Sequence, residues 1–330
     1  MRFLFCFVVL LATSAEAAEH EFKIATLAPE GSTWWKVLKE ADKRLDDLSG
    51  GRVRFKIYAG GVAGDEPVAV RKMRLGQLQG AGMTSVGLAE IQPALLALQA
   101  PGLYQNWKEL DDVRNHLSEQ FKSLLGEKGF VVLTWVDVGF NRMFTNVRIT
   151  KPEDMKALKP WCWTQDGVYR AYYAKAGANA VLVGVPEVLP GLQTGLIDSF
   201  SAPPLVAVSM QWFSRAKFML DVPQNATIGA IVLKKSAVDK LSAADQLILT
   251  QVGRELGDKL AAAVRADNEA SMEAIRKAGI TVVTADVAAK QAWQALGEQS
   301  SDQAAADGVY PKALLQEIRR VVRGLRVAVK

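Results

Sequence analysis

The spacing of hydrophobic and polar residues predicts a strand–helix–strand unit near the start of the chain. Residues 22–27, FKIATL, form a short apolar run typical of a buried strand. Apolar residues then recur every three or four positions, behind an N-cap at Ser32 or Thr33 and ahead of a stop at Gly50. The segment RVRFKIYAGG alternates apolar and polar residues as a second strand does. Such a unit is the building block of a mainly parallel sheet.

The same alternation of elements continues through the rest of the chain. Helical spacing is expected over residues 65–78, 107–129, 167–177, 186–195 and 242–278, and extended segments over 80–86, 130–139, 179–185, 196–201 and 280–284. Thr150 and Glu153 have the spacing of a capping box, with Pro152 in the first turn. No low-complexity linker interrupts the pattern, so we expect an α/β fold of two lobes joined by chain crossovers. Ligands of such folds lie in the crevice between the lobes.

The first residues fit a cleavable secretory signal peptide. Arg2 supplies a positive start, Phe3 to Leu11 is an apolar run, and Ala15-Glu16-Ala17 is an A-x-A cleavage site. The run is too short to cross a bilayer as a helix of about 20 residues. The sequence therefore predicts a signal peptide over residues 1–17 and an exported mature protein, soluble in the periplasm, that begins near Ala18.

Composition and charge are those of an ordinary folded protein. The 330 residues are 49% hydrophobic and 23% charged, and the formal net charge of +5 is mild for this length. Basic residues gather near the C-terminus with apolar residues between them, which favours an amphipathic helix docked on the body over nucleic-acid or membrane binding. These residues are Arg319, Arg320, Arg323, Arg326 and Lys330. Only Cys162 outlasts signal cleavage, so we expect no internal disulfide and a buried thiol.

Motifs for catalysis or metal binding are missing from the sequence. His20 and His116 have no neighbour at metal-ligand spacing, and the chain contains no phosphate loop, dinucleotide-binding fingerprint or nucleophile elbow. Asp65-Glu66 follows the glycine-rich GGVAG, and the start of a helix explains it best. We therefore predict no metal, no cofactor and no enzymatic activity.

Several segments together resemble the solute-binding proteins of TRAP (tripartite ATP-independent periplasmic) transporters. They include FKIATLAPEGSTWWK, GGVAGDE, TWVDVGFNRMFTN, KPEDMKALK and AGANAVLVGVPEVLPGLQTGLIDSFSAPP. The resemblance covers nearly the whole chain after the signal peptide. It implies a two-lobed periplasmic-binding-protein fold with mixed, mainly parallel sheets, helices on both sheet faces, a long helix spanning both lobes and a cleft that closes on its solute.

The resemblance also implies domain boundaries and partners. Lobe I is expected over residues 18–139 plus about 228–268, and lobe II over 140–227 plus about 269–330. The partners implied are a small organic solute and the small and large membrane subunits of a TRAP permease. A helical-repeat periplasmic protein is a further partner that works with some members of this subgroup, and no nucleic acid is expected.

The chain departs from the family at the residues that commonly bind a carboxylate. Most members have an arginine at the end of a K-G-L-K-x-R segment, and Trp161 stands at that position here. An indole has one N–H and no charge, so it does not replace the two-pronged guanidinium clamp. A second family arginine, in a G-x-R pattern, corresponds to Arg142 only if the register is counted back from Asn146. Counted from Gly139, Asn141 takes its place, so a ligand contact and a structural ion pair both stay open for Arg142.

Other substitutions point toward a less polar cleft. Ala202 replaces a family amide, and Thr84 and Ser85 occupy a loop that is acidic in some members. Trp35 is favoured over Trp34 as the ligand-facing residue of the first helix, and Trp163 fits core and cleft equally. Trp135 and Phe144 are further candidates for the apolar wall. The predicted ligand-binding residues are Trp161, Arg142, Phe200, Ala202, Trp35, Thr84, Ser85, Trp163 and Asn141.

Three functions follow from this reading of the residues. The first is a receptor for a hydrophobic or bulky, weakly polar organic solute. The second is a receptor of the same class for an aromatic or branched monocarboxylate held by Arg142. The third, of a different class, is a periplasmic scaffold or sensor subunit whose exposed apolar cleft binds a protein partner.

Overall fold

The computed structural model describes residues 19–328, so the predicted signal peptide lies outside the described residues. Its strands are β1 (His20–Thr26), β2 (Val53–Tyr58), β3 (Gly80–Thr84), β4 (Phe130–Phe140), β5 (Arg142–Thr145), β6 (Trp161–Cys162), β7 (Val181–Leu182), β8 (Ser199–Ala202), β9 (Phe218–Leu220), β10 (Ala226–Lys234) and β11 (Thr281–Val283). Its α-helices are α1 (Thr33–Ser49), α2 (Glu66–Arg74), α3 (Ser85–Ala89), α4 (Trp107–Gly126), α5 (Gly167–Ala176), α6 (Val188–Thr194), α7 (Pro204–Ser209), α8 (Lys235–Val238), α9 (Ala243–Lys277), α10 (Val287–Ala306) and α11 (Lys312–Ala328). Short 3-10 helices are η1 (Pro93–Gln99), η2 (Pro152–Ala157), η3 (Val185–Glu187) and η4 (Trp212–Arg215).

Two mixed sheets form the centres of two lobes, as predicted. The first has the strand order β2-β1-β3-β10-β4, and the second has the order β11-β9-β5-β8. In the first sheet β1 pairs in parallel with β2 and β3, whereas β10 runs antiparallel to β3 and β4. In the first sheet, parallel strand pairings are therefore not the majority, although mainly parallel sheets were expected. The reason is that β10 brings the chain back from the second lobe and so enters the first sheet in the opposite direction.

Strands β4 and β10 carry the chain between the lobes side by side. β4 continues into β5 through Asn141, and Asn225 lies just before β10. Across this crossover the Asn141 N–H donates to the Asn225 carbonyl at 2.9 Å, and the Gln224 N–H donates to the Asn141 carbonyl at 3.1 Å. The two crossovers thus form one paired backbone ribbon, which sets the position of one lobe relative to the other.

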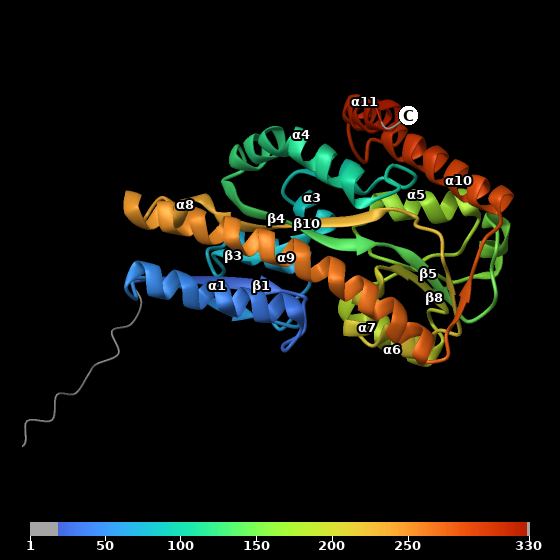
Figure 1. The fold of residues 1–330 in the computed structure, drawn as a ribbon, viewed down its shortest axis with the longest axis horizontal. Coiled ribbons are helices and arrows are strands. Elements are labelled where there is room, and N and C mark those ends of the chain that lie inside the picture. The colour runs from blue at the N-terminus through green and yellow to red at the C-terminus, as the bar shows by residue number, and fades with distance from the viewer. Residues whose placement is uncertain (1–18, 329–330) are drawn as a thin grey trace, which may run out of the picture.

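Helix α9 spans both lobes as one 35-residue helix, which confirms the long helix predicted from residues 242–278. Figure 1 shows it running beneath the long strands β4 and β10 (Figure 1). It packs against α1 and β4 in the first lobe and against α7 in the second. Ser242 caps its first turn by accepting the Asp245 N–H at 3.1 Å.

Local signals placed most of the other elements correctly. Ser32 caps α1 by accepting the Trp35 N–H, and Gly50 ends that helix in the left-handed conformation. The capping-box prediction named the wrong acidic residue. Asp154, and not Glu153, accepts hydrogen bonds from the backbone N–H groups of Thr150 and Lys151. The periodicity also left out α10 and the central strand β10, whose residues are almost all buried and so lack an alternating pattern.

The C-terminal helix α11 docks on the body, as its amphipathic pattern predicts. Leu315, Ile318 and Val322 are buried on its inner face. On the same side of the helix, the Arg326 guanidinium donates to the Glu109 carboxylate of α4 at 2.8 Å. Arg326 therefore serves the contact between α11 and α4, and Arg319 serves the contact with α10 through Asp302 and the Glu298 carbonyl. Within residues 19–328, no helix combines the length and the apolar character needed to cross a bilayer.

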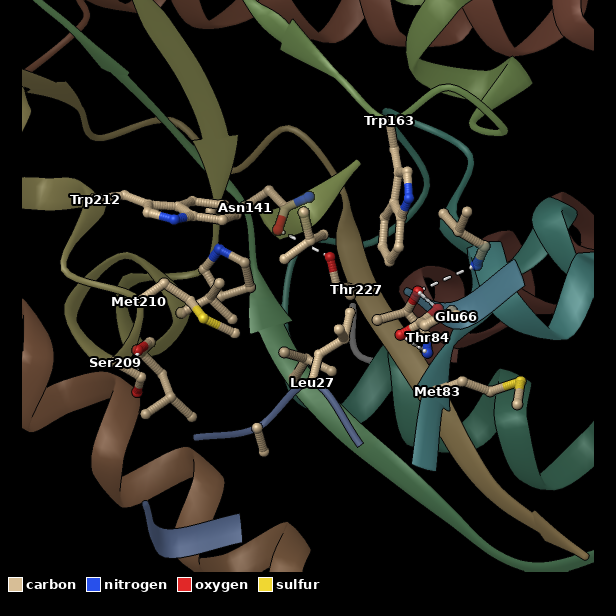
Figure 2. A pocket seen from close by; sticks show the side chains of 18 of the residues that line it. Leu27, Glu66, Met83, Thr84, Asn141, Trp163, Ser209, Met210, Trp212 and Thr227 are labelled. Atoms are coloured by element: carbon tan, nitrogen blue, oxygen red, sulfur yellow. Dashed lines mark hydrogen bonds between the residues drawn. The ribbon is translucent and has the colours of Figure 1, made fainter. Parts of the chain in front are cut away.

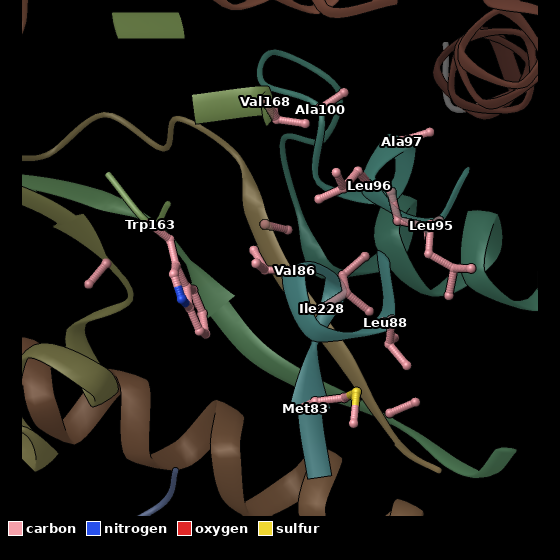
Figure 3. Close-up of a cluster of buried hydrophobic side chains, with 14 of the residues drawn as sticks. Met83, Val86, Leu88, Leu95, Leu96, Ala97, Ala100, Trp163, Val168 and Ile228 are labelled. Carbon is pink, nitrogen blue, oxygen red and sulfur yellow. The ribbon is translucent and has the colours of Figure 1, made fainter. Parts of the chain in front are cut away.

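The largest hydrophobic core contains side chains from both lobes. Figure 3 shows Trp163, from the loop after β6, in one hydrophobic cluster with Val86 and Ile228 of the first lobe (Figure 3). Trp163 is 6% exposed. This tryptophan of the second lobe thus shares a hydrophobic core with the first lobe, as expected for a closed arrangement of the two lobes.

Helix α9 approaches β4 so closely that glycine is required at the contact. A Cβ on Gly253 would lie 2.5 Å from Leu133 Cδ1 and 2.9 Å from the Leu133 carbonyl oxygen. Since a backbone atom is among the obstacles, Gly253→Ala forces the helix away from the sheet. We expect a loss of about 1–3 kcal/mol in the free energy of unfolding, measured by urea denaturation.

Gly324→Ala in α11 is the matched control, because its Cβ would have no heavy atom within 4 Å. There we expect a gain of about 0.5–1 kcal/mol from helix propensity. Equal effects of the two substitutions would contradict the close packing of α9 on β4.

Candidate ligand-binding site

A cavity of about 170 Å³ lies between the lobes. The β1–α1 loop and β3 form one wall, and β6, β8 and the segment from α7 to η4 form the other. Asn141 and Thr227 line it from the two crossovers. Figure 2 shows Leu27 and Thr84 on one side of this space and Met210 and Trp212 on the other (Figure 2). The site is thus built from segments far apart in sequence, which meet only when both lobes are in place.

Four tryptophans line the cavity: Trp34, Trp161, Trp163 and Trp212. The Trp161 and Trp212 rings pack edge to face with centroids 5.1 Å apart, and Trp161 and Trp163 lie 6.1 Å apart at 35°. The Trp161 indole N–H donates to the Val183 carbonyl at 3.0 Å, and the Trp163 indole N–H donates to Asp65 Oδ2 at 2.9 Å. Because both donors have protein partners, these two residues offer a ligand ring carbon surface.

The polar side chains of the crossover region bond mainly to one another. Asn141 Nδ2 donates to Asn225 Oδ1 at 2.8 Å and to the Tyr169 hydroxyl at 3.0 Å, and Asn141 Oδ1 accepts the Thr227 hydroxyl at 2.9 Å. The Ser201 hydroxyl donates to Gln224 Oε1 at 2.6 Å. A buried network of this kind fixes the geometry of the wall and leaves few donors for a ligand.

Two buried acids also line the cavity, and both have protein donors. Glu66 accepts the Thr84 N–H, the Thr84 hydroxyl and the Gly87 N–H at 2.8–2.9 Å. Burial raises the pKa of Glu66 to about 8, against the opposing effect of these hydrogen bonds. Asp166 caps α5, and burial raises its pKa to about 6. The described residues that line the cavity include no lysine, arginine or histidine, so a ligand carboxylate would meet no cationic side chain among them.

The family follows from comparison with known proteins. Residues 24–307 match the model of the bacterial extracellular solute-binding proteins, family 7. The chain belongs to this family. Its members are the solute-binding receptors of TRAP transporters and not enzymes, which confirms the resemblance stated above. The chain is therefore an extracytoplasmic receptor for a small organic solute that works with TRAP membrane subunits.

Individual relatives are distant in sequence and close in fold. The 2,3-diketo-L-gulonate-binding periplasmic protein of Escherichia coli is 26% identical over 289 residues, covering 86% of this chain and 86% of that protein. A TRAP periplasmic solute-binding protein of Chromohalobacter salexigens, solved with bound D-glucuronate, superposes with a TM-score of 0.85 at 23% identity, covering 91% of this chain and 99% of the other. One from Ralstonia eutropha, solved with (S)-2-acetolactate, gives 0.85 at 20% identity, covering 92% and 99%.

In this TRAP receptor, five of the residues predicted from sequence meet at the cavity. Trp161, Trp163, Asn141, Thr84 and Ala202 all line it. Trp34 lines it in place of Trp35, whose side chain is not among the lining residues. The reason lies in β3: a Cβ on Gly82 would come within 3.2 Å of the Trp34 ring, so the missing side chain there makes room for Trp34.

Arg142, Phe200 and Ser85 are not among the lining residues, and each has a structural role. Arg142 Nε donates to Asp221 Oδ1 at 3.1 Å, and burial lowers the pKa of its guanidinium. Phe200 packs edge to face beneath Trp212, with centroids 5.5 Å apart, and is fully buried. The Ser85 hydroxyl donates to the Ile228 carbonyl at 3.0 Å. The structure thus favours the ion-pair interpretation of Arg142.

The two further candidates for the apolar wall are also placed elsewhere. Trp135 donates its indole N–H to Ser118 Oγ on α4 at 2.9 Å. The Phe144 ring stacks on Phe200 at 4.8 Å in the core of the second sheet. Neither side chain lines the cavity, because both lie on the sheet faces that the helices cover.

Sequence reasoning missed Met210, Trp212 and Tyr173. Met210 and Trp212 flank Gln211, whose φ of 59° is the one left-handed non-glycine backbone within residues 19–328. This turn, between α7 and η4, places both neighbours at the cavity. The adjacent Trp-Phe pair in the sequence was a usable signal, but nothing local indicated the turn.

Glu66 should make stability depend on pH. An unfolded glutamate loses its proton near pH 4.5, whereas folded Glu66 keeps it up to about pH 8, so the folded state holds one more proton between these values. Stability therefore falls as pH rises through this window, by at most about 1.4 kcal/mol per pH unit from this group. We expect Glu66→Gln to show a smaller loss of stability between pH 5 and pH 8 in urea denaturation.

Glu119→Gln is the control, since the Glu119 side chain is 86% exposed. It should keep the wild-type dependence on pH. A Glu66→Gln profile that runs parallel to the wild-type profile would show that Glu66 is ionised throughout this range.

Proposed function

We propose that this receptor delivers a hydrophobic or bulky, weakly polar organic solute to its TRAP permease. The observation that carries the proposal is the chemistry of the cavity wall. Four tryptophans line it, and no cationic side chain is among its described lining residues. The Trp161 ring, at the position where the family resemblance expects an arginine, contributes apolar surface and bonds its only donor to Val183.

The energetics favour an uncharged ligand. An apolar group gains roughly 25 cal/mol for each Å² of surface removed from water. A carboxylate would lose its hydration with no cation to replace it, at a cost of several kcal/mol. The buried acids Glu66 and Asp166 would add to that cost wherever they carry charge. Solved relatives with bound D-glucuronate or (S)-2-acetolactate share the fold with this chain, and the absence of a cation among the described lining residues supports a different solute class here.

One group in the wall supports a weakly polar rather than a purely apolar solute. The Tyr173 hydroxyl is buried and has no hydrogen-bond partner among the described residues, and Tyr173 lines the cavity. A buried hydroxyl without a partner is unfavourable by about 1–3 kcal/mol, so a ligand hydroxyl or carbonyl that met it would be bound more tightly.

The monocarboxylate alternative depends on Arg142, whose guanidinium is paired with Asp221. To bind a ligand acid it would have to exchange that partner. The scaffold alternative depends on an open apolar cleft, whereas here the apolar surface faces an interlobe cavity of ligand size. A helical-repeat partner stays a prediction of the family resemblance. The neutral-solute receptor thus agrees with more of the structure than either alternative.

Native mass spectrometry of gently purified protein is the direct test of solute class. We expect a copurified neutral or weakly polar organic molecule. N-phenyl-1-naphthylamine, an uncharged fluorescent probe, should bind saturably and be displaced by that molecule. Recovery of only small dicarboxylates or sugar acids, together with no saturable probe binding, would overturn the proposal.

Trp161→Ala should weaken probe binding at least tenfold while the protein stays folded. The substitution removes a ring from the cavity wall, and the lost contact area is worth about 1.5–3 kcal/mol. Trp135→Ala is a matched control, because Trp135 is also half-buried with a bonded indole N–H but lies outside the cavity. We expect it to lower stability and leave the dissociation constant within twofold. Normal affinity in a destabilised Trp161→Ala protein would assign Trp161 to the core.

Arg142→Ala separates the neutral solute from the monocarboxylate. With Arg142 bonded to Asp221, its removal should lower stability by about 1–3 kcal/mol, because it leaves a polar partner unpaired. Affinity for the copurified ligand should change less than threefold. A loss of tenfold or more in affinity, measured by isothermal titration calorimetry, would favour the monocarboxylate.

A further inference from the structure

Resting on the proposed function, we propose that the Asp65 carboxylate is a positioning group that holds the two lobes closed over the solute. It does so through an interlobe bridge, defined here as Asp65 with the Trp163 indole N–H and the Val185 amide. The bridge couples a side chain that lines the cavity to the opposite lobe.

The two oxygens of Asp65 serve different lobes. Oδ1 accepts the Glu66 N–H at 2.8 Å and caps α2 in the first lobe. Oδ2 accepts the Trp163 indole N–H at 2.9 Å and the Val185 N–H at 3.3 Å, both from the second lobe. Hydrogen bonds to an ionised carboxylate are among the stronger ones in proteins. Oδ1 therefore stabilises the start of α2, and Oδ2 stabilises the contact between the lobes.

A glycine leaves room for this contact. A Cβ on Gly184 would lie 2.7 Å from Asp65 Oδ2. Gly184 has φ −73° and ψ 168°, which any residue adopts. The backbone therefore does not require glycine here. The space that a Cβ would fill is occupied by the Asp65 carboxylate and, equally close at 2.7 Å, by Glu187 Oε2.

Trp163 joins the bridge to the ligand. Its N–H end contacts Asp65, while its ring lines the cavity and belongs to the same hydrophobic cluster as the first-lobe residues Val86 and Ile228. Opening the lobes would break both indole contacts and expose the half-buried Asp65 carboxylate further to water. A solute that packs against the ring stabilises the same arrangement, so solute binding and closure reinforce each other.

The bridge lies apart from the crossover ribbon. Asn141 and Asn225 hold the lobes through the backbone, and Gln99 Nε2 donates to Asp166 Oδ2 at 3.2 Å between η1 and α5. The crossover is covalently continuous with both lobes, whereas the Gln99–Asp166 bond, like the Asp65 contacts, joins segments that are separate along the chain. The Asp65 contacts exist only when α2 of the first lobe meets the β6 and η3 segments of the second. They are therefore suited to report and to stabilise closure.

Distances between spin labels on the two lobes test the proposal. Lys43→Cys on α1 and Lys175→Cys on α5 are exposed labelling sites, and the native Cys162 thiol is 2% exposed. Pulsed electron double resonance would be recorded for protein as purified and with N-phenyl-1-naphthylamine added. The readout is the ratio of the shorter, closed distance to the longer, open one.

Two variants weaken the bridge by different means. Trp163→Phe keeps an aromatic ring and removes the N–H, and Gly184→Ala fills the space of the carboxylate. Each should lower the closed-to-open ratio roughly tenfold, as expected for loss of a hydrogen bond to a charged group. Trp293→Phe is the matched control: its N–H donates to the Thr150 carbonyl at 2.9 Å, outside the cavity and away from the first lobe. It should keep the wild-type ratio.

The outcomes separate this proposal from the proposed function. Wild-type ratios in both Trp163→Phe and Gly184→Ala, or no closed distance in the wild-type protein under either condition, would overturn the bridge. A closed distance that depends on Trp163 and Gly184, in a protein that does not bind the probe, would support the bridge and count against the neutral solute alone.

Discussion

The structure depends on the pairing of its two crossover segments. Asn141 donates a backbone and a side-chain hydrogen bond to Asn225, and accepts the Gln224 N–H, where β4 leaves the first lobe and β10 returns to it. This pairing sets the antiparallel direction of β10, and with it the mixed first sheet. It also fixes the floor of the cavity, because Asn141 and Thr227 line it from the crossover. Without this paired ribbon, nothing in the backbone would hold the two walls of the cavity in position relative to each other.

The chemistry of the cavity depends on which hydrogen-bond partners the polar groups in its wall already have. The indole N–H groups of Trp161 and Trp163 bond to protein acceptors, and the amides and hydroxyls of the crossover bond to one another. What remains for a ligand is largely ring carbon and aliphatic surface. Buried polar groups stabilise a fold only when they are satisfied, so satisfying them internally produces an apolar site.

Most of the fold was predictable from the sequence because its signals are local. Periodicity, caps and left-handed glycines depend on neighbours a few residues apart, and they placed α1 and the long helix α9 correctly. Strand β10 was missed because nearly every side chain in it is buried, so it carries no alternation to detect. The acid of the η2 cap was misassigned because Asp154 and Glu153 are adjacent, and only the backbone decides which one turns inward.

The site divides in the same way. The sequence by itself indicated Trp161, Thr84, Asn141 and Ala202 through family register, and it left Trp163 equally between core and cleft. The same register also named Arg142, Phe200, Ser85 and Trp35, which do not line the cavity. Only the tertiary structure decided that Arg142 pairs with Asp221, 79 residues away, and that Trp163 bonds to Asp65, 98 residues away. It also decided that Trp212 faces the cavity and Phe200 supports it. A side chain's partner depends on which surfaces pack together, and that is settled by the whole fold rather than by neighbours along the chain.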